Sequence, residues 1–369
     1  SSKQTDGKGG KGGATPSPGA SSTTSPDATG TASPGASSTT KPTAQPTTRN
    51  FPAITGAIAA VAGVSITGSI VPVEMLAIDP AGQIPGMLLI PAGDHVIAVS
   101  TSDAPTSYDA TALGQTFTGA RAVVTGGTST AYVIATVNQA LSLITLDLTK
   151  LALKQANPAS VQSLQGQASN ANLGAMAFNP NDGKIYVVDE TNDTVDTIAP
   201  GSGQVTVYMG VSGQAGSSTS GAVTSFQMKQ PKGLAIDGNT LYVADSGNNR
   251  ILKVDLTGNT ATVLAGSADA SPGMVDGPLA GSTFDRPVGL FLTSDKKLIV
   301  PDQANGGLRE VDPSGDGVYS FEKTGASNGS QMLSFPVGAV KFNGNYYALD
   351  NLGALQKFVP AGSANTGAS

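Results

Sequence analysis

The chain has 369 residues, of which 39% are hydrophobic and 12% are charged, and its net charge is −6. It contains no cysteine, which excludes disulfides, thiolate metal sites and cysteine nucleophiles, and its single histidine excludes zinc sites built on two or three imidazoles. The acidic balance, without a clustered basic stripe, argues against a nucleic-acid partner, because phosphates have to be neutralised by grouped Lys and Arg side chains.

Residues 1–50 form a polar N-terminal segment. They contain no Val, Ile, Leu or aromatic residue, and the octamer SPGASSTT occurs twice, at Ser17–Thr24 and Ser33–Thr40. Such a segment cannot bury enough apolar surface to offset its ordering entropy, so we expect a disordered, semi-flexible tether. The tether resembles the spacer that follows the lipidated cysteine of bacterial lipoproteins. This resemblance implies a lipid anchor before Ser1, and an ordinary secreted protein is the alternative.

Residues 51–78 are rich in apolar side chains, but glycines, Pro72 and Glu74 interrupt them, and Thr and Ser alternate with Val and Ile. This pattern predicts β-strands rather than a membrane-spanning helix.

Six related units follow along the chain. Weak units begin near Pro85 and Arg121, and clearer ones cover 172–210, 226–266, 284–321 and 335–359. The first β-rich run of each unit contains a small residue, and these residues are Gly86, Ala122, Gly174, Gly233, Gly289 and Gly338.

The unit at 226–266 shows the pattern best. Its four β-rich runs, KGLAID, TLYVAD, RILKVD and TATVLAG, are separated by Gly238-Asn239 and by the polar turns SGNN and TGN. Four short strands joined by tight turns are typical of one propeller blade. Six such units predict an all-β, six-bladed β-propeller over 51–369, and a seventh, degenerate blade from 54–80 is the alternative.

The final unit is one strand short, because the polar run after Pro360 is unsuited to a strand. A three-stranded blade would leave an exposed edge. The apolar runs within 54–71 have no blade of their own, so we expect one of them to supply the missing outer strand and close the ring.

Two further motifs are FDRPVGL at 284–290 and YVADSGNNRILKVD at 242–255. Both resemble the NHL repeat, and the segment 266–290 is similar to the long inter-blade loop of bacterial NHL proteins. The resemblance implies an NHL-like propeller, but the family serves many functions, so it implies architecture and not activity.

The candidate binding residues recur in the turn after the second strand of the clearer units. In one interpretation, the aspartates form a partial ring of acids at the channel mouth that holds a cation such as Ca²⁺. In the other, which the resemblance favours, each aspartate caps its turn, and Asp245 pairs with Arg250 and Asp302 with Arg309. The candidates are Asp189, Asp245, Asp302, Asp350, Asn248 and Arg250.

Other polar residues give weaker signals. His95 and Glu190 are expected at the surface, and Asp276 in the long loop is either a turn residue or an ion ligand. Tyrosines of the second strands are expected to pack between blades, and aromatic side chains left at a rim would contact a protein or glycan instead. These tyrosines are Tyr186, Tyr242, Tyr346 and Tyr347.

The composition, tether and repeats together favour a non-catalytic binding or scaffold module outside the cytoplasm, at the cell surface, anchored to the outer membrane, periplasmic or secreted. Its partner would be a protein or glycan at a propeller face, where loops carry recognition. No catalytic residue and no cofactor is predicted, with Ca²⁺ as the open option. The alternatives are a metal-dependent propeller enzyme, similar to lactonases or lyases and using a central carboxylate-bound ion, and a subunit of a surface filament.

Overall fold

The computed structural model describes residues 59–65, 76–78 and 86–358, apart from 103, 128, 316 and 322–332. All of these residues belong to one compact unit, Pro46–Ser369. The predicted tether, residues 1–50, lies outside the described residues. For 59–65, 76–78, 110 and 111 only the backbone is described.

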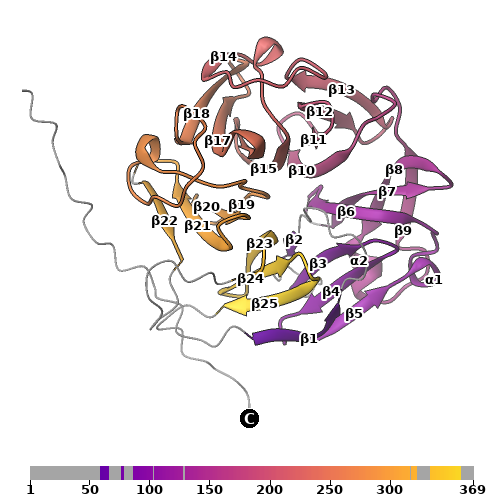
Figure 1. Cartoon of the computed structure of the whole chain (residues 1–369). Helices are drawn as coiled ribbons and strands as arrows, with labels where there is room; N and C mark the ends of the chain where they lie inside the picture. Colours follow the sequence, from indigo (N-terminus) through magenta and orange to yellow (C-terminus); the bar gives the residue numbers. More distant parts are fainter. Residues whose placement is uncertain are drawn as a thin grey trace, which may run out of the picture. The chain divides into compact units, whose positions relative to one another are not determined.

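Within these ranges the strands form six antiparallel sheets around a central opening (Figure 1). The predicted all-β, six-bladed propeller is therefore confirmed. We number the sheets as blades one to six.

Blades one to three come from the first half of the chain. Blade one contains β2 (Leu76–Ile78), β3 (Met87–Ala92), β4 (His95–Ser100) and β5 (Pro105–Tyr108). Blade two contains β6 (Thr118–Thr125), β7 (Thr130–Val137), β8 (Ala140–Asp147) and β9 (Ala159–Ser163). Blade three contains β10 (Leu173–Asn179), β11 (Lys184–Asp189), β12 (Thr194–Ala199) and β13 (Gln204–Met209).

Blades four to six complete the ring. Blade four contains β15 (Pro231–Asp237), β16 (Thr240–Asp245), β17 (Arg250–Asp255), β18 (Thr260–Gly266) and the added edge strand β14 (Ser220–Ala222). Blade five contains β19 (Phe291–Leu292), β20 (Leu298–Asp302), β21 (Gly307–Asp312) and β22 (Gly317–Ser320). Blade six contains β23 (Pro336–Phe342), β24 (Asn345–Asp350), β25 (Ala354–Phe358) and β1 (Ala59–Ser65).

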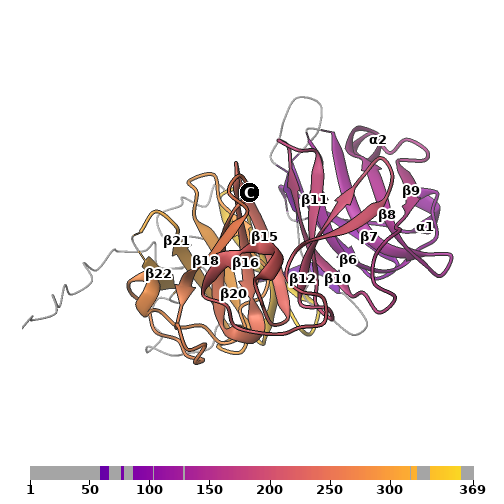
Figure 2. The same cartoon turned by 90° about the horizontal axis from the view of Figure 1, so that it is seen from above.

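Among the described residues, two short α-helices lie outside the blades. They are α1 (Ala110–Leu113) and α2 (Leu148–Ala152), and α1 is found at the outer rim in both views (Figure 1 and Figure 2). Among the helices of the described residues, none has the length and apolar character needed to span a bilayer.

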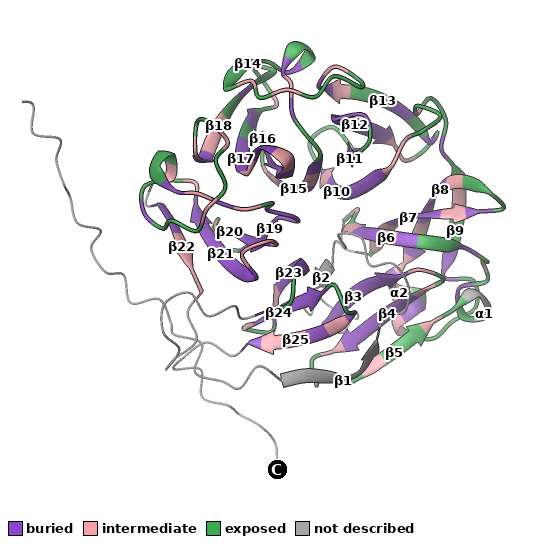
Figure 3. Ribbon diagram, viewed as in Figure 1, coloured by how far each residue is buried: buried purple, intermediate pink, exposed green. Residues whose placement is uncertain are grey.

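The hairpins form where turn residues interrupt the β-rich runs. Asp237 pairs with Thr240 across a two-residue turn in which Gly238 has φ +57°, a conformation that favours glycine. The second strand of this blade, β16, is buried along nearly its whole length because both of its faces are covered by neighbouring blades. Exposed residues lie in turns and loops and on outer strands such as β5, β13 and β14 (Figure 3).

The core lies between successive blades. Tyr186 of blade three belongs to the same core cluster as Leu234 of blade four, and Tyr242 of blade four to the same cluster as Leu290 of blade five. Tyr346 and Tyr347 of blade six contact opposite neighbours in the same way. The prediction that these tyrosines pack between blades is confirmed, and each inter-blade contact removes apolar surface from water.

The N-terminal strands join existing blades. Strand β1 pairs antiparallel with β25, through Ala59 with Lys357 and Ala60 with Gln356, and forms the outer edge of blade six. Strand β2 pairs with β3 at the inner side of blade one. Among the described residues no seventh sheet forms, so the alternative of a seventh blade from 54–80 is wrong.

Candidate functional site

The four predicted aspartates end the second strand of their blades, as expected. Each lies where this strand leads into the following turn, and all four are buried. They are Asp189 on β11, Asp245 on β16, Asp302 on β20 and Asp350 on β24.

Asp245 is the centre of a buried hydrogen-bond network in blade four. Its Oδ1 accepts the backbone N–H of Lys229 at 2.7 Å, and its Oδ2 accepts Asn248 Nδ2 and Arg250 Nε, each at 2.8 Å. Arg250 also donates from Nη2 to the carbonyl of Ser218 at 2.9 Å. Because both charged groups are fully buried, these bonds offset the desolvation of the pair. The predicted pairing of Asp245 with Arg250 is confirmed.

Blade five repeats this network with Asp302 and Arg309, whose predicted pairing at 2.8 Å is also confirmed. Arg309 lies over the ring of Phe284 at 5.0 Å and holds Asp276 of the long loop at 2.8 Å. Asp276 further accepts the backbone N–H and the hydroxyl of Ser320. These bonds give Asp276 a role in anchoring the long loop to the edge of blade five.

The turns also join successive blades. Asn249 has φ +54° and its Oδ1 accepts the backbone N–H of Arg286, at the entrance to blade five, at 2.9 Å. Asp193 occupies the same turn position in blade three and accepts the backbone N–H of Gln230, at the entrance to blade four, at 2.7 Å. Asn249 thus connects two blades while it ends its turn in a left-handed conformation.

Asp189 and Asp350 cap their turns without an arginine. Asp189 Oδ1 accepts the backbone N–H of Asn172 at 3.1 Å and of Thr191 and Asn192 at 3.2 Å. Asp350 Oδ1 accepts two N–H groups of its own turn at 2.9 Å. The structure therefore brings Asp245, Asn248 and Arg250 together but leaves the other aspartates in separate blades. No group of three acidic or imidazole side chains suited to a metal ion occurs among the described residues. A ligand-binding role for the six candidates stays a prediction.

A cavity of about 370 Å³ opens where the inner strands of blades two to six meet. We call it the apolar cavity. Its described lining is made of backbone, small residues and aliphatic or aromatic side chains, with no carboxylate or imidazole. Five half-buried side chains on four inner strands line it, and these are Val124, Phe178, Ile236, Phe291 and Leu292. Its size and lining match those of sites for small, largely apolar ligands.

Glycines let the inner strands approach one another above this cavity. A Cβ added to Gly233 would lie 2.6 Å from the backbone of Gly289, and the N–H of Gly289 donates to the carbonyl of Lys232 at 3.2 Å. Gly233 is therefore required because the inner strands of blades four and five meet backbone to backbone at this point.

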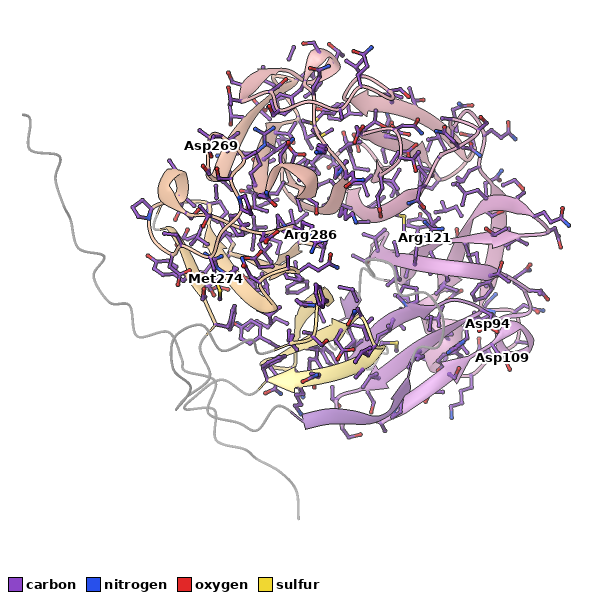
Figure 4. All side chains as sticks on the ribbon, in the orientation of Figure 1. Asp94, Asp109, Arg121, Asp269, Met274 and Arg286 are labelled. Atoms are coloured by element: carbon purple, nitrogen blue, oxygen red, sulfur yellow. The ribbon has the colours of Figure 1, made fainter. Side chains whose placement is uncertain are left out.

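A second pocket, of about 320 Å³, lies at the other end of β10 and β15. We call it the polar pocket. The side chain of Glu190 is only 13% exposed and lies 4.0 Å from Lys232 Nζ, which corrects the prediction that it is a surface residue. Gly174 makes room for it, since a Cβ there would lie 2.7 Å from Glu190 Oε1. Burial raises the pKa of Glu190, and the charges of Lys232 and Arg121 oppose this rise. Arg121 is found beside the central opening (Figure 4).

The two cavities were missed because their signals are weak in one sequence. The apolar cavity is lined by consecutive, mostly apolar residues of the inner strands, and such residues are equally typical of a buried core. Glu190 is not repeated in the other units, so the repeat pattern does not indicate a functional role for it. Its approach to Lys232 depends on the contact between blades three and four.

Comparison with known proteins supports the repeat assignment. The NHL repeat family model matches residues 228–254, which include the turn of Asp245. A segment of 136 residues, 35% of the chain, is 31% identical to NHL repeat-containing protein 2 of Bos taurus, and covers 19% of that protein. Another, 23% of the chain, is 34% identical to the Arabidopsis thaliana protein SUPPRESSOR OF QUENCHING 1, chloroplastic, and covers 8% of it. The chain thus spans a small part of these relatives.

Solved structures share the fold at low identity. A protein of unknown function from Bacteroides thetaiotaomicron has a TM-score of 0.58 and 16% identity over 83% of this chain and 72% of its own. An auxiliary nutrient binding protein from Bacteroides ovatus has a TM-score of 0.56 and 16% identity over 79% of this chain and 70% of its own. The repeat match and the six sheets together define the class: the chain is a six-bladed β-propeller that contains an NHL repeat. In fold it resembles the auxiliary nutrient binding proteins of Bacteroides.

Proposed function

We propose that this propeller is a non-catalytic binding module that acts outside the cytoplasm and holds a small ligand in the apolar cavity. The observation that carries the proposal is the lining of that cavity by the inner strands of five blades. A rigid ring of strands keeps such a site preformed, which lowers the entropic cost of binding. The resemblance in fold to auxiliary nutrient binding proteins supports a binding role.

The chemistry of the cavity supports binding over catalysis. Its described lining offers no general acid or base and no carboxylate ligand for a metal ion. The enzyme alternative depends on the repeated aspartates, and each of these accepts backbone N–H groups in its own blade. The location outside the cytoplasm rests on the composition of residues 1–50.

Probe binding to the cavity tests the proposal. We expect the uncharged dye N-phenyl-1-naphthylamine to bind the wild-type protein with enhanced fluorescence, and the substitution Ile236→Lys to weaken that binding about tenfold, because it places a charge among apolar groups. Val207→Lys is the matched control, since Val207 is 50% exposed on outer strand β13. Equal affinities for both variants would contradict the assignment of the ligand to this cavity.

A further inference from the structure

The polar pocket differs from the apolar cavity in both position and chemistry. Lys232 and Ile236 lie on the same strand, four residues and therefore ~13 Å apart, and they line different cavities. Every residue that lines the polar pocket is polar, and the set is Asn172, Glu190, Thr191, Asp193, Gln230 and Lys232.

Within the described part of the chain, several hydrogen-bonding groups of the pocket have no hydrogen-bond partner. Among the described residues, the carboxylate of Glu190 accepts no hydrogen bond, and its closest cation, Lys232 Nζ, lies at 4.0 Å, beyond hydrogen-bond distance. Asn172 Oδ1 accepts a hydrogen bond from Arg121, which leaves the Nδ2 donor of Asn172 available. An acceptor, an ammonium and an amide donor therefore face one small volume.

Charges of both signs surround the pocket. Glu190, Asp193 and Lys232 line it, and the charges of Arg121 and Asp189 act on Glu190 from beside it. An anionic ligand would be attracted by Lys232 and repelled by Glu190, and a cationic ligand would meet the reverse. A neutral ligand with several hydroxyl groups meets neither penalty, because each hydroxyl both donates and accepts hydrogen bonds. Adjacent hydroxyls can thus bridge Glu190 and Lys232 with charge-assisted bonds.

We infer that the polar pocket is a saccharide-binding site, in which Glu190, Lys232 and Asn172 bind the hydroxyl groups of a neutral sugar. The inference goes beyond the proposed function, since it concerns a second site that does not depend on the apolar cavity.

The test measures the affinity of neutral sugars by titration calorimetry. The probes are glucose, galactose, mannose, N-acetylglucosamine and maltose, with glucuronate and glucosamine as charged analogues. We expect at least one neutral sugar to bind, and Glu190→Gln and Lys232→Met each to raise its Kd about tenfold through loss of a charge-assisted bond. Binding should remain unchanged in Ile236→Lys, which separates this site from the apolar cavity.

Asp237→Asn is the matched control. Asp237 ends the same strand β15 and pairs with Lys296 at 2.6 Å, far from the polar pocket. The inference is overturned if no sugar of the panel binds, if a charged analogue binds more tightly than every neutral sugar, or if Glu190→Gln and Lys232→Met, with melting temperatures near that of the wild type, bind as well as Asp237→Asn does.

Discussion

At the scale of single residues, the charged pair Asp245–Arg250 of the repeat motif has a structural role in the turn of blade four. The two groups are fully buried, and Asp245 also ties the turn to the backbone of Lys229. One guanidinium nitrogen of Arg250, Nη1, has no hydrogen-bond partner among the described residues. The pair therefore fixes the turn geometry, while its net contribution to stability is limited by desolvation.

Breaking this pair should destabilise the protein strongly. We expect Asp245→Ala to lower the free energy of unfolding by about 3–5 kcal/mol, because it leaves the Arg250 charge buried without a partner. Urea denaturation measures this change. The control is Asp285→Ala, since Asp285 and Arg286 are 3.8 Å apart and partly exposed, and it should cost about 0–1 kcal/mol. A loss at Asp245 no greater than that of the control would refute the structural role.

At the scale of strands and turns, the repeat made most of the blades predictable. Val, Ile, Leu and Tyr runs separated by glycine and asparagine turns identify β15 to β18 directly. Strand β14 has the sequence SGA and is exposed throughout, so it carries no apolar pattern and forms only because β18 offers backbone partners. The polar pocket was not predictable, because it arises where two blades meet.

The inner strands depend on glycine at their closest approach. We expect Gly233→Ala to lower the free energy of unfolding by about 1–3 kcal/mol, because the new Cβ would overlap the backbone of Gly289, which cannot move without shifting blade five. Gly201→Ala is the control, since a Cβ there has nothing within 4 Å. Thermal unfolding measures the stability of both variants. Equal losses would show that the inner strands can accommodate a Cβ at residue 233.

At the scale of the whole molecule, blade six is assembled from both ends of the described chain. Strands β23 to β25 come from its end, and β1 comes from its beginning. That this pairing closes and stabilises the ring is our prediction. Without β1, β25 would present an unpaired edge to solvent.

Two truncations test this prediction. A protein starting at residue 51 should melt as the full chain does, whereas one starting at residue 72 lacks β1 and should melt about 5 °C lower or more. Differential scanning calorimetry provides both values. Equal melting temperatures for the two truncated proteins would mean that β1 does not hold the ring closed.

The pairing of β1 with β25 also sets an order of events during synthesis. The ribosome makes β1 first, and its partner appears only after almost all of the described chain has emerged. Contacts of such high sequence separation form slowly, and strand edges that wait for a partner are prone to aggregation. A nascent chain must therefore keep β1 unpaired, or shielded by a chaperone, until its last blade has been translated.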